Sequence, residues 1–233
     1  MKAVIVIPAR WASTRFPGKP LAMIAGVSLI RRVVERASLA RRASKVFVAT
    51  DDPRIADHVR SFGGNVVLPA GEFQSGTDRI AASLDLLGEE FDAVINVQGD
   101  EPLIDADSID SVVDALKNAD MATLSCGIEN EEELRSRDIV KVVTALDGTA
   151  LYFSRAPLAG AERHIGLYGY RTQVLRALAR LAPSPLERAE SLEQLRALQN
   201  GFKIQVLHTR KPHLGVDRPE DVLRVEQELA KHG

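Results

Sequence analysis

The chain has 233 residues, of which 27% are charged and 45% are hydrophobic, and this length suits one large domain or one domain with a small appendage. Because 30 Lys and Arg residues face 32 Asp and Glu residues, the formal net charge of -2 argues against a nucleic-acid binder held mainly by bulk positive charge. The single cysteine, Cys126, excludes an intramolecular disulfide and a multi-cysteine metal site, so we expect a cytoplasmic protein.

Short runs rich in apolar and β-branched residues predict buried parallel strands at residues 3–7, 45–49, 93–97 and 121–125. The first run is too short for a signal peptide and no run reaches about 20 apolar residues, so we expect neither a signal peptide nor a membrane span. Between the strands, apolar residues recur on one helical face at residues 28–43, 77–87 and 107–117. This alternation predicts an α/β sheet whose ligands lie beyond the carboxyl ends of the strands.

The pattern changes after about residue 138. Strands predicted at residues 139–143 and 150–153 flank Asp147 and Gly148, a pair typical of a hairpin turn, and another strand is predicted at residues 165–170. Helices are predicted at residues 186–199 and 218–231, with a strand at residues 203–208 between them. Without a linker, a repeat or a low-complexity stretch, we expect one domain over residues 1–233 that contains a smaller antiparallel subregion at about residues 138–200.

A loop of about a dozen residues follows the first strand and is rich in cations and hydroxyls. It contains Arg10, Ser13, Thr14, Arg15 and Lys19. Three cations beside backbone N–H groups would suit a triphosphate, although a solvated basic turn is the alternative. A P-loop is rejected because Ser13 and Pro20 stand where that motif needs Gly and Ser or Thr, and no G-x-G-x-x-G follows the strand.

Two carboxylates are candidates for holding a hard cation. Asp100 follows the strand at residues 93–97, next to Gly99, which allows close backbone approach, and an Asx-type turn before Pro102 is its alternative role. Asp217 offers the second carboxylate near the chain's end. It is equally consistent with N-capping of the last helix, so its role stays open.

Two further segments carry polar side chains that suit a ligand. Residues 73–79 place small polar residues and Gly at a helix start, where they could bind a base or ribose, or where Thr77 could simply cap the helix. Residues 164–171 group a histidine, two tyrosines and Arg171, which could line a site for an acidic, hydroxylated ligand or be ordinary half-buried strand residues. The five histidines show no metal-ligand spacing.

Together, these segments resemble the 3-deoxy-manno-octulosonate cytidylyltransferase family. The resemblance runs in order along nearly the whole chain and is carried by residues 7–10, 19–20, 48–51, 74–77, 96–102, 151–155, 164–166, 192–196 and 215–217. It implies a nucleotidyltransferase-type, Rossmann-like α/β fold with a mostly parallel mixed sheet, in a homodimer. It also implies that CTP and the eight-carbon acid sugar 3-deoxy-D-manno-octulosonate (Kdo) react with Mg2+ to give CMP-Kdo and pyrophosphate, for lipopolysaccharide biosynthesis.

The resemblance also implies roles for individual residues. Arg10, Ser13, Thr14, Arg15 and Lys19 would hold the triphosphate; Gln74, Ser75, Gly76, Arg79 and Gln98 would surround cytosine and ribose; Arg155, His164, Tyr168, Glu193 and Gln194 would contact the sugar; and Asp100 and Asp217 would bind magnesium. The anomeric hydroxyl would then attack the α-phosphorus in line, without a protein nucleophile, with Arg10, Arg15, Lys19 and Asp100 as the catalytic residues.

The sequence departs from the family between Arg155 and His164, where residues 156–163 form a shorter segment than is usual. This segment adjoins the expected sugar site, so a related acid sugar, such as an 8-amino analogue or a sialic-type acid, is an alternative substrate. Arg163 and Arg171 are the next candidates for binding the sugar carboxylate if Arg155 points away. A catalytically silent nucleotide sensor on the same fold is the alternative from another class, and the combination of Lys19 with two acidic residues argues against it.

Overall fold

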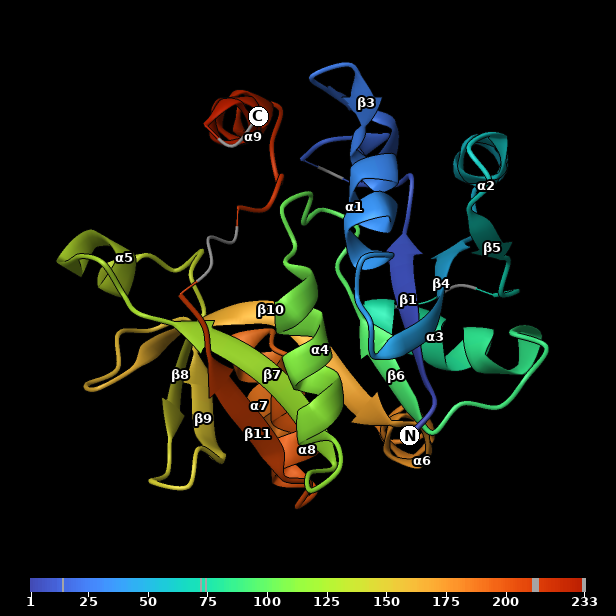
Figure 1. Cartoon of the computed structure of the whole chain (residues 1–233). Coiled ribbons are helices and arrows are strands. Elements are labelled where there is room, and N and C mark those ends of the chain that lie inside the picture. Colours follow the sequence, from blue (N-terminus) through green and yellow to red (C-terminus); the bar gives the residue numbers. More distant parts are fainter. Residues whose placement is uncertain (14, 72, 74, 211–213, 232–233) are drawn as a thin grey trace.

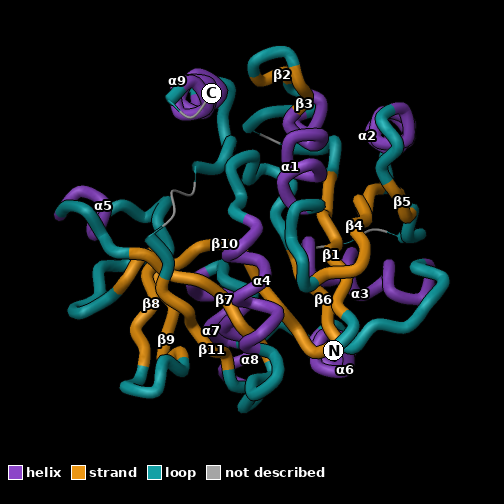
Figure 2. Tube along the Cα trace, in the orientation of Figure 1, coloured by secondary structure: helices purple, strands orange, loops and turns teal. Residues whose placement is uncertain are grey.

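The computed structural model describes residues 1–13, 15–71, 73, 75–210 and 214–231, and within them nine strands form one sheet (Figure 1, Figure 2). Seven strands follow the order β11-β7-β10-β6-β1-β4-β5, and β8 and β9 extend the sheet from β10. The strands are β1 (Ala3–Ala9), β4 (Ala43–Thr50), β5 (Asn65–Val67), β6 (Ala93–Asn96), β7 (Met121–Cys126), β8 (Lys141–Thr144), β9 (Ala150–Ser154), β10 (Glu162–Arg171) and β11 (Ile204–His208). A separate small hairpin joins β2 (Met23–Ile24) to β3 (Val27–Ser28).

The predicted mixed and mostly parallel sheet is confirmed. Strand β1 pairs in parallel with β4 and β6, β4 with β5, and β7 with β11. The antiparallel part is the β8–β9 hairpin together with β10, and β10 runs between β6 and β7 inside the main sheet. The antiparallel segment is therefore part of the central sheet, and its residues reach the same edge as the ends of β1 and β6.

Helices cover both faces of the sheet (Figure 1). One face carries α1 (Leu29–Ala37), α2 (Pro53–Ser61), α4 (Ala106–Ala115) and α9 (Asp221–Ala230), and the other carries α3 (Gly76–Ser83), α6 (Thr172–Leu178), α7 (Pro185–Glu190) and α8 (Gln194–Gln199). Alternate residues of β1 serve the two cores, because Ile5 packs with the first set and Val4 with the second. Burial on both faces explains why the strand is continuously apolar.

Several helices differ from their predicted extent. The helix expected at residues 28–43 ends at Ala37, where Ser38 caps it and its hydroxyl donates to the Val34 carbonyl at 2.7 Å. The helix expected at residues 186–199 is broken into α7 and α8 because Ser191 adopts a left-handed conformation with φ of 55°. Helix α2, strand β5, α6 and the short α5 (Glu131–Arg135) were not predicted.

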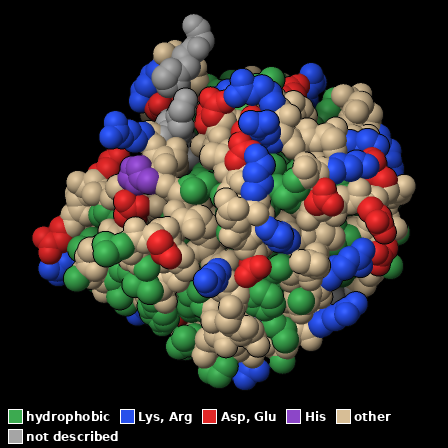
Figure 3. Space-filling view, turned by 60° about the horizontal axis from the view of Figure 1, so that its bottom comes forward, with side chains coloured by type: hydrophobic (Ala, Val, Ile, Leu, Met, Phe, Trp, Pro, Cys, Tyr) green, Lys and Arg blue, Asp and Glu red, His purple; other side chains and the backbone are tan. Residues whose placement is uncertain are grey.

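Charges of both signs share the surface. On the face shown in Figure 3, Lys and Arg side chains are interspersed with Asp and Glu side chains. Two leucines of the β8–β9 hairpin are also exposed, Leu146 with a relative exposure of 111% and Leu151 with 62%. Among the described residues, no helix has the length and hydropathy needed to cross a membrane.

Candidate active site

Two adjoining cavities open at the carboxyl ends of β1 and β6. The loop-side cavity, of about 300 Å³, is lined by Arg10, Ser13, Arg15, Lys19, Ser75 and Arg79. The sheet-side cavity, of about 440 Å³, is lined by Arg155, Arg163, His164, Tyr168, Tyr170, Gln194 and Arg196. Both cavities share Gly76, Gln98, Asp100, Glu193 and Asp217. Two ligands bound side by side would therefore meet at these shared residues.

The two candidate metal-binding carboxylates converge on one lysine. The Lys19 ammonium lies 2.6 Å from Asp100 Oδ2 and 3.6 Å from Asp217 Oδ1. Arg15 donates to Asp217 Oδ1 at 2.9 Å, and the Lys19 side chain is only 14% exposed. Segments at the start, the middle and the end of the chain thus place two cations and two carboxylates at the junction of the cavities.

Asp217 does not cap the last helix. Helix α9 begins at Asp221, whose carboxylate accepts hydrogen bonds from the backbone N–H groups of Asp217 and Arg218. The Asp217 side chain instead turns toward Arg15 and Lys19. The capping alternative for Asp217 is therefore wrong, and its carboxylate is directed into the site.

Close backbone packing positions Asp100. A Cβ atom on Gly99 would lie 2.8 Å from the Pro8 carbonyl oxygen, so the ends of β1 and β6 could not approach this closely with a larger residue. The Asp100 carbonyl accepts from the backbone N–H of Val216 at 2.8 Å, which ties the Asp217 segment to the same strand end. The Asx-turn alternative for Asp100 is not observed, because its carboxylate contacts Lys19.

Buried polar atoms without partners mark the cavities. Among the described residues four such side-chain atoms occur, and two of them, Arg79 Nη1 and Gln194 Nε2, belong to residues lining the cavities. A third, on Glu101, lies beside Asp100, and burial together with the charge of Asp100 raises the pKa of Glu101 to about 8. An unpaired buried donor costs about 1–3 kcal/mol, so these atoms are typical of a site that a ligand completes.

The start of α3 joins the two cavities. Ser75, and not Thr77, caps this helix by accepting from the backbone N–H of Asp78 at 3.1 Å, so the proposed Thr77 cap is wrong. Burial raises the pKa of Glu193, while hydrogen bonds from Thr77 and Ser75 act in the opposite direction. Arg79, which is 5% exposed, donates to Asp51 at 2.8 Å and keeps its other terminal nitrogen free for a ligand of the loop-side cavity.

Arg155 reaches the sheet-side cavity although the segment after it is short. The Glu190 carboxylate accepts from the Arg155 backbone N–H at 3.0 Å and from the Ser154 hydroxyl at 2.9 Å. The Arg155 guanidinium donates to the Arg137 carbonyl at 3.0 Å. The fully buried Lys141 donates to the Arg155 carbonyl at 3.2 Å. These contacts hold the end of β9 against the cavity.

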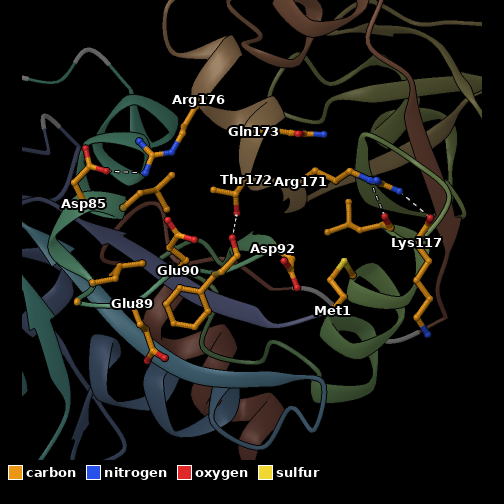
Figure 4. A pocket seen from close by; sticks show the side chains of 15 residues that line it. Met1, Asp85, Glu89, Glu90, Asp92, Lys117, Arg171, Thr172, Gln173 and Arg176 are labelled. Carbon is orange, nitrogen blue, oxygen red and sulfur yellow. Dashed lines mark hydrogen bonds and ion pairs between the residues drawn. The ribbon is translucent and has the colours of Figure 1, made fainter.

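Arg163 and Arg171, the two alternative candidates for binding the sugar carboxylate, have different positions. Arg163 lines the sheet-side cavity and pairs with Glu133 at 3.3 Å. Arg171 lies at the opposite edge of the sheet (Figure 4), where it donates to the backbone carbonyls of Leu116 and Lys117 and also to that of Ala119. The proposal of Arg171 as a ligand-binding residue is therefore wrong, because its guanidinium binds backbone carbonyls at the C-terminal end of α4.

The cavity at that opposite edge is large, about 940 Å³, but several of its polar residues have structural partners. Arg176 pairs with Asp85 at 2.6 Å, and the Thr172 hydroxyl donates to the Phe91 carbonyl at 2.7 Å (Figure 4). It lies at the amino ends of β1 and β6, away from the strand ends where ligands of α/β sheets bind. We therefore assign the active site to the two smaller cavities.

The break between α7 and α8 directs Glu193 and Gln194 into the site. Ser191 occupies the left-handed region, which is uncommon for a residue other than glycine and clusters at functional sites. Beyond the break, the buried Arg196 forms hydrogen bonds to Glu187 at 2.8 and 2.5 Å and lines the sheet-side cavity. Arg196 is not among the predicted site residues, although it lies in the segment 192–196 that carries the resemblance.

Aromatic rings close the sheet-side cavity. His164 lies edge-on to Phe153 at 5.1 Å and beside Tyr168 at 5.3 Å between ring centroids, and Tyr168 stacks with Tyr170 at 6.1 Å. Burial lowers the pKa of His164 to about 3, so the imidazole is neutral at physiological pH. The cavity therefore offers a neutral histidine between aromatic walls, with cations at its rim.

Of the predicted site residues, Thr14 and Gln74 lie outside the described residues, and the others, apart from Arg171, all line one or both cavities. Within the described part of the chain, no group of three or more His, Cys, Asp or Glu side chains forms a metal site. Two carboxylates nevertheless suit Mg2+, which is usually held by one or two carboxylates together with substrate phosphates and water. Asp100 and Asp217 fit that description.

Comparisons with known proteins agree with the architecture. A family model described as Cytidylyltransferase matches residues 4–204. The 3-deoxy-manno-octulosonate cytidylyltransferase of Syntrophotalea carbinolica is 47% identical over 249 residues and covers 98% of this chain and 99% of its own. The 8-amino-3,8-dideoxy-manno-octulosonate cytidylyltransferase of Shewanella sp. (strain ANA-3) is 44% identical over 243 residues, covering 99% of both. A solved structure of CMP:2-keto-3-deoxy-manno-octonic acid synthetase complexed with CTP is 38% identical, with a TM-score of 0.94 and full coverage of both chains.

Proposed function

The chain belongs to the 3-deoxy-manno-octulosonate cytidylyltransferase family, and we propose that it makes CMP-Kdo and pyrophosphate from CTP and Kdo, for lipopolysaccharide biosynthesis. The observation that carries this function is the junction of two cavities at Asp100 and Asp217, with Lys19 beside both carboxylates. A reaction that joins two substrates requires their reacting atoms to meet, and this junction supplies that place.

The loop-side cavity binds CTP. Arg10, Arg15 and Lys19 bind the triphosphate, with Ser13 and Thr14 as hydroxyl donors, and their positive charge stabilises the pyrophosphate as it leaves. Cytosine and ribose lie against the α3 start, where Ser75, Gly76, Arg79 and Gln98 surround them, and the family resemblance adds Gln74 to this set. The free Arg79 nitrogen supports this assignment, because a ligand acceptor would satisfy it.

The sheet-side cavity binds the acid sugar. Arg155 forms two hydrogen bonds to the sugar carboxylate, which a planar guanidinium matches in geometry. His164, Tyr168, Glu193 and Gln194 bind the hydroxyl groups. Gln194 is 6% exposed, and its buried Nε2 has no partner, so this nitrogen is suited to donate one of these hydrogen bonds.

The reaction is an in-line displacement at phosphorus. The anomeric oxygen forms a bond to the α-phosphorus, the bond between this phosphorus and the bridging oxygen of pyrophosphate breaks, and the hydroxyl proton passes to water. No protein nucleophile is needed, so the residues act by positioning and by stabilising charge.

Asp100 and Asp217 are the residues that would hold Mg2+, because both carboxylates face one point at the junction. Lys19 and Arg15 occupy their oxygens in this structure and would turn toward the triphosphate when substrate binds. When bound, the ion neutralises phosphate charge and orients the substrate oxygens.

A pyrophosphate-release assay tests the function. With CTP and Mg2+, Kdo should give rapid release, and the 8-amino analogue and a sialic-type acid should be used less efficiently. A higher kcat/KM for the 8-amino analogue than for Kdo would make the analogue the preferred substrate, and the proposed cytidylyl transfer would still hold. CTP binding without release on any acid sugar would instead support the nucleotide sensor.

We also propose that the enzyme works as a homodimer in the cytoplasm, where CTP is available. The exposed Leu146 and Leu151 of the β8–β9 hairpin support self-association, because contact between two copies of the chain would remove these apolar side chains from water. Light scattering should give twice the chain mass, and a monomer at micromolar concentration would contradict the dimer.

A further inference from the structure

A buried hydroxyl group contacts the histidine of the sheet-side cavity from behind. Thr123 lies on β7 and is fully buried, and its Oγ1 lies 2.9 Å from His164 Nε2. The same oxygen lies 2.8 Å from the Leu167 carbonyl oxygen and 3.2 Å from that of Ile165. One hydroxyl therefore serves three polar atoms that come from neighbouring positions of β10.

An irregularity in β10 creates this arrangement. The pairing of β10 with β7 shifts register between Ile165 and Tyr168, so that extra residues of β10 lie opposite the Leu124–Thr123 step. Such bulges disturb the local hydrogen-bond ladder and redirect side chains near active sites. Here the bulge brings two carbonyl groups to the Thr123 hydroxyl and lies directly beside the cavity, whose lining includes His164 and Tyr168.

The hydroxyl contacts decide where the histidine carries its proton. A carbonyl oxygen can only accept, so the single Thr123 proton points to the Leu167 or Ile165 carbonyl. If this proton pointed to His164 instead, the hydroxyl lone pairs would face both carbonyl oxygens, at 2.8 and 3.2 Å, and the like partial charges would repel each other. Toward His164 the hydroxyl must therefore accept, and Nε2 must donate. Because burial keeps the ring neutral, Nδ1 is left with a lone pair.

We propose that Thr123 is a positioning residue for sugar binding, because it fixes His164 with its proton on Nε2 and leaves Nδ1 to accept a hydrogen bond from a sugar hydroxyl. The described residues supply no partner for Nδ1, and His164 lines the sheet-side cavity. This inference rests on the proposed function, since the sheet-side cavity must be the sugar site. A histidine held this way selects a donor group on the substrate and rejects a bare acceptor.

Nitrogen NMR of the histidine side chains tests the tautomer without any turnover. At neutral pH in the wild type, His164 should show a protonated Nε2 and an unprotonated Nδ1, with its signals assigned by their loss in His164→Gln. Addition of Kdo should shift the Nδ1 signal. A protonated Nδ1 or an imidazolium in the wild type would overturn the proposal, even if every Thr123 variant failed to fold.

Steady-state kinetics test the consequence. Thr123→Val keeps the shape and removes the hydroxyl, so the KM for Kdo should rise about tenfold, as for loss of one hydrogen bond, while the KM for CTP stays within about twofold. Thr123→Ser should restore the sugar KM. Thr172→Val is the matched control, because it removes a hydroxyl that also donates to a backbone carbonyl, at the opposite edge of the sheet (Figure 4).

The outcomes separate this inference from the proposed function. An unchanged Kdo KM in Thr123→Val, or an equal loss for both substrates that Thr123→Ser does not repair, would overturn the positioning role alone. Absence of pyrophosphate release by the wild type would overturn the function, and the NMR measurement would still report on the tautomer.

Discussion

Replacing Asp217 by Asn separates a role in chemistry from a role in stability. The substitution keeps the shape of the side chain and removes its charge. Asp217 does not cap α9, and its carboxylate contacts Arg15 at 2.9 Å and Lys19 at 3.6 Å. The Asp217 and Arg15 side chains are 54% and 53% exposed, so water screens their ion pair strongly.

The structure sets different magnitudes for the two effects. An exposed ion pair contributes about 0–1 kcal/mol, and in a chain of this size that shifts the melting temperature by at most about 4 °C. Asp217 is proposed to hold Mg2+, so loss of its charge would weaken the ion's stabilisation of the transition state much more than it weakens the fold. We expect kcat to fall about 100- to 1,000-fold, and the Mg2+ concentration for half-maximal rate to rise.

Pyrophosphate release under saturating CTP and Kdo, measured over a Mg2+ titration, provides the rate, and thermal unfolding provides the stability. Asp85→Asn is the matched control, because Asp85 forms a similarly exposed pair with Arg176 at 2.6 Å at the opposite edge of the sheet (Figure 4). Both variants should be nearly as stable as the wild type, and only Asp217→Asn should lose activity. Activity within about threefold of wild type at every Mg2+ concentration would refute the reasoning and leave Asp217 as a partner of Arg15 alone.

Three further predictions concern other parts of the molecule. Arg155→Lys should lower kcat/KM for Kdo about 10- to 150-fold without changing the KM for CTP, because an ammonium cannot form the paired hydrogen bonds; a change in CTP binding alone would move Arg155 to the triphosphate site. Burial lowers the pKa of His164 to about 3 in the folded protein, whereas the pKa of a histidine in the unfolded chain is near 6.5. Below about pH 6.5 the unfolded chain therefore binds a proton that the folded protein does not, and the free energy of unfolding decreases as the pH falls. Denaturant unfolding should show that this residue costs the wild type about 1.4 kcal/mol at pH 5.5 and that His164→Gln lacks this loss; identical pH slopes would contradict it. Arg54 stacks 3.4 Å above the ring of Trp11, the only tryptophan, which lies in the loop proposed to bind the triphosphate. Arg54→Ala should therefore change the intrinsic fluorescence and raise the KM for CTP about 2- to 5-fold. Arg60→Ala on the same helix should change neither quantity.

Local sequence patterns were enough to predict most of the sheet and the segments that carry the site. The apolar runs that became β1, β6 and β7 are buried on both faces, as is the Val48–Thr50 end of β4, and that double burial makes a strand visible as a continuous apolar stretch. The cation-rich loop after β1 and the Gly99–Asp100 turn were also visible, because loop composition and glycine placement reflect local backbone requirements.

Tertiary structure alone decided how these segments meet. Arg15 and Asp217 are 202 positions apart, and no local pattern shows that Asp217 faces Arg15 and Lys19 while Asp221 binds the backbone at the helix start. The insertion of β10 between β6 and β7 depends on strand pairing across the whole chain, and it separates Arg163, which lines the cavity, from Arg171, which closes the end of α4. Periodicity records which face of a segment is buried, whereas the partner of that face is chosen by packing among distant segments.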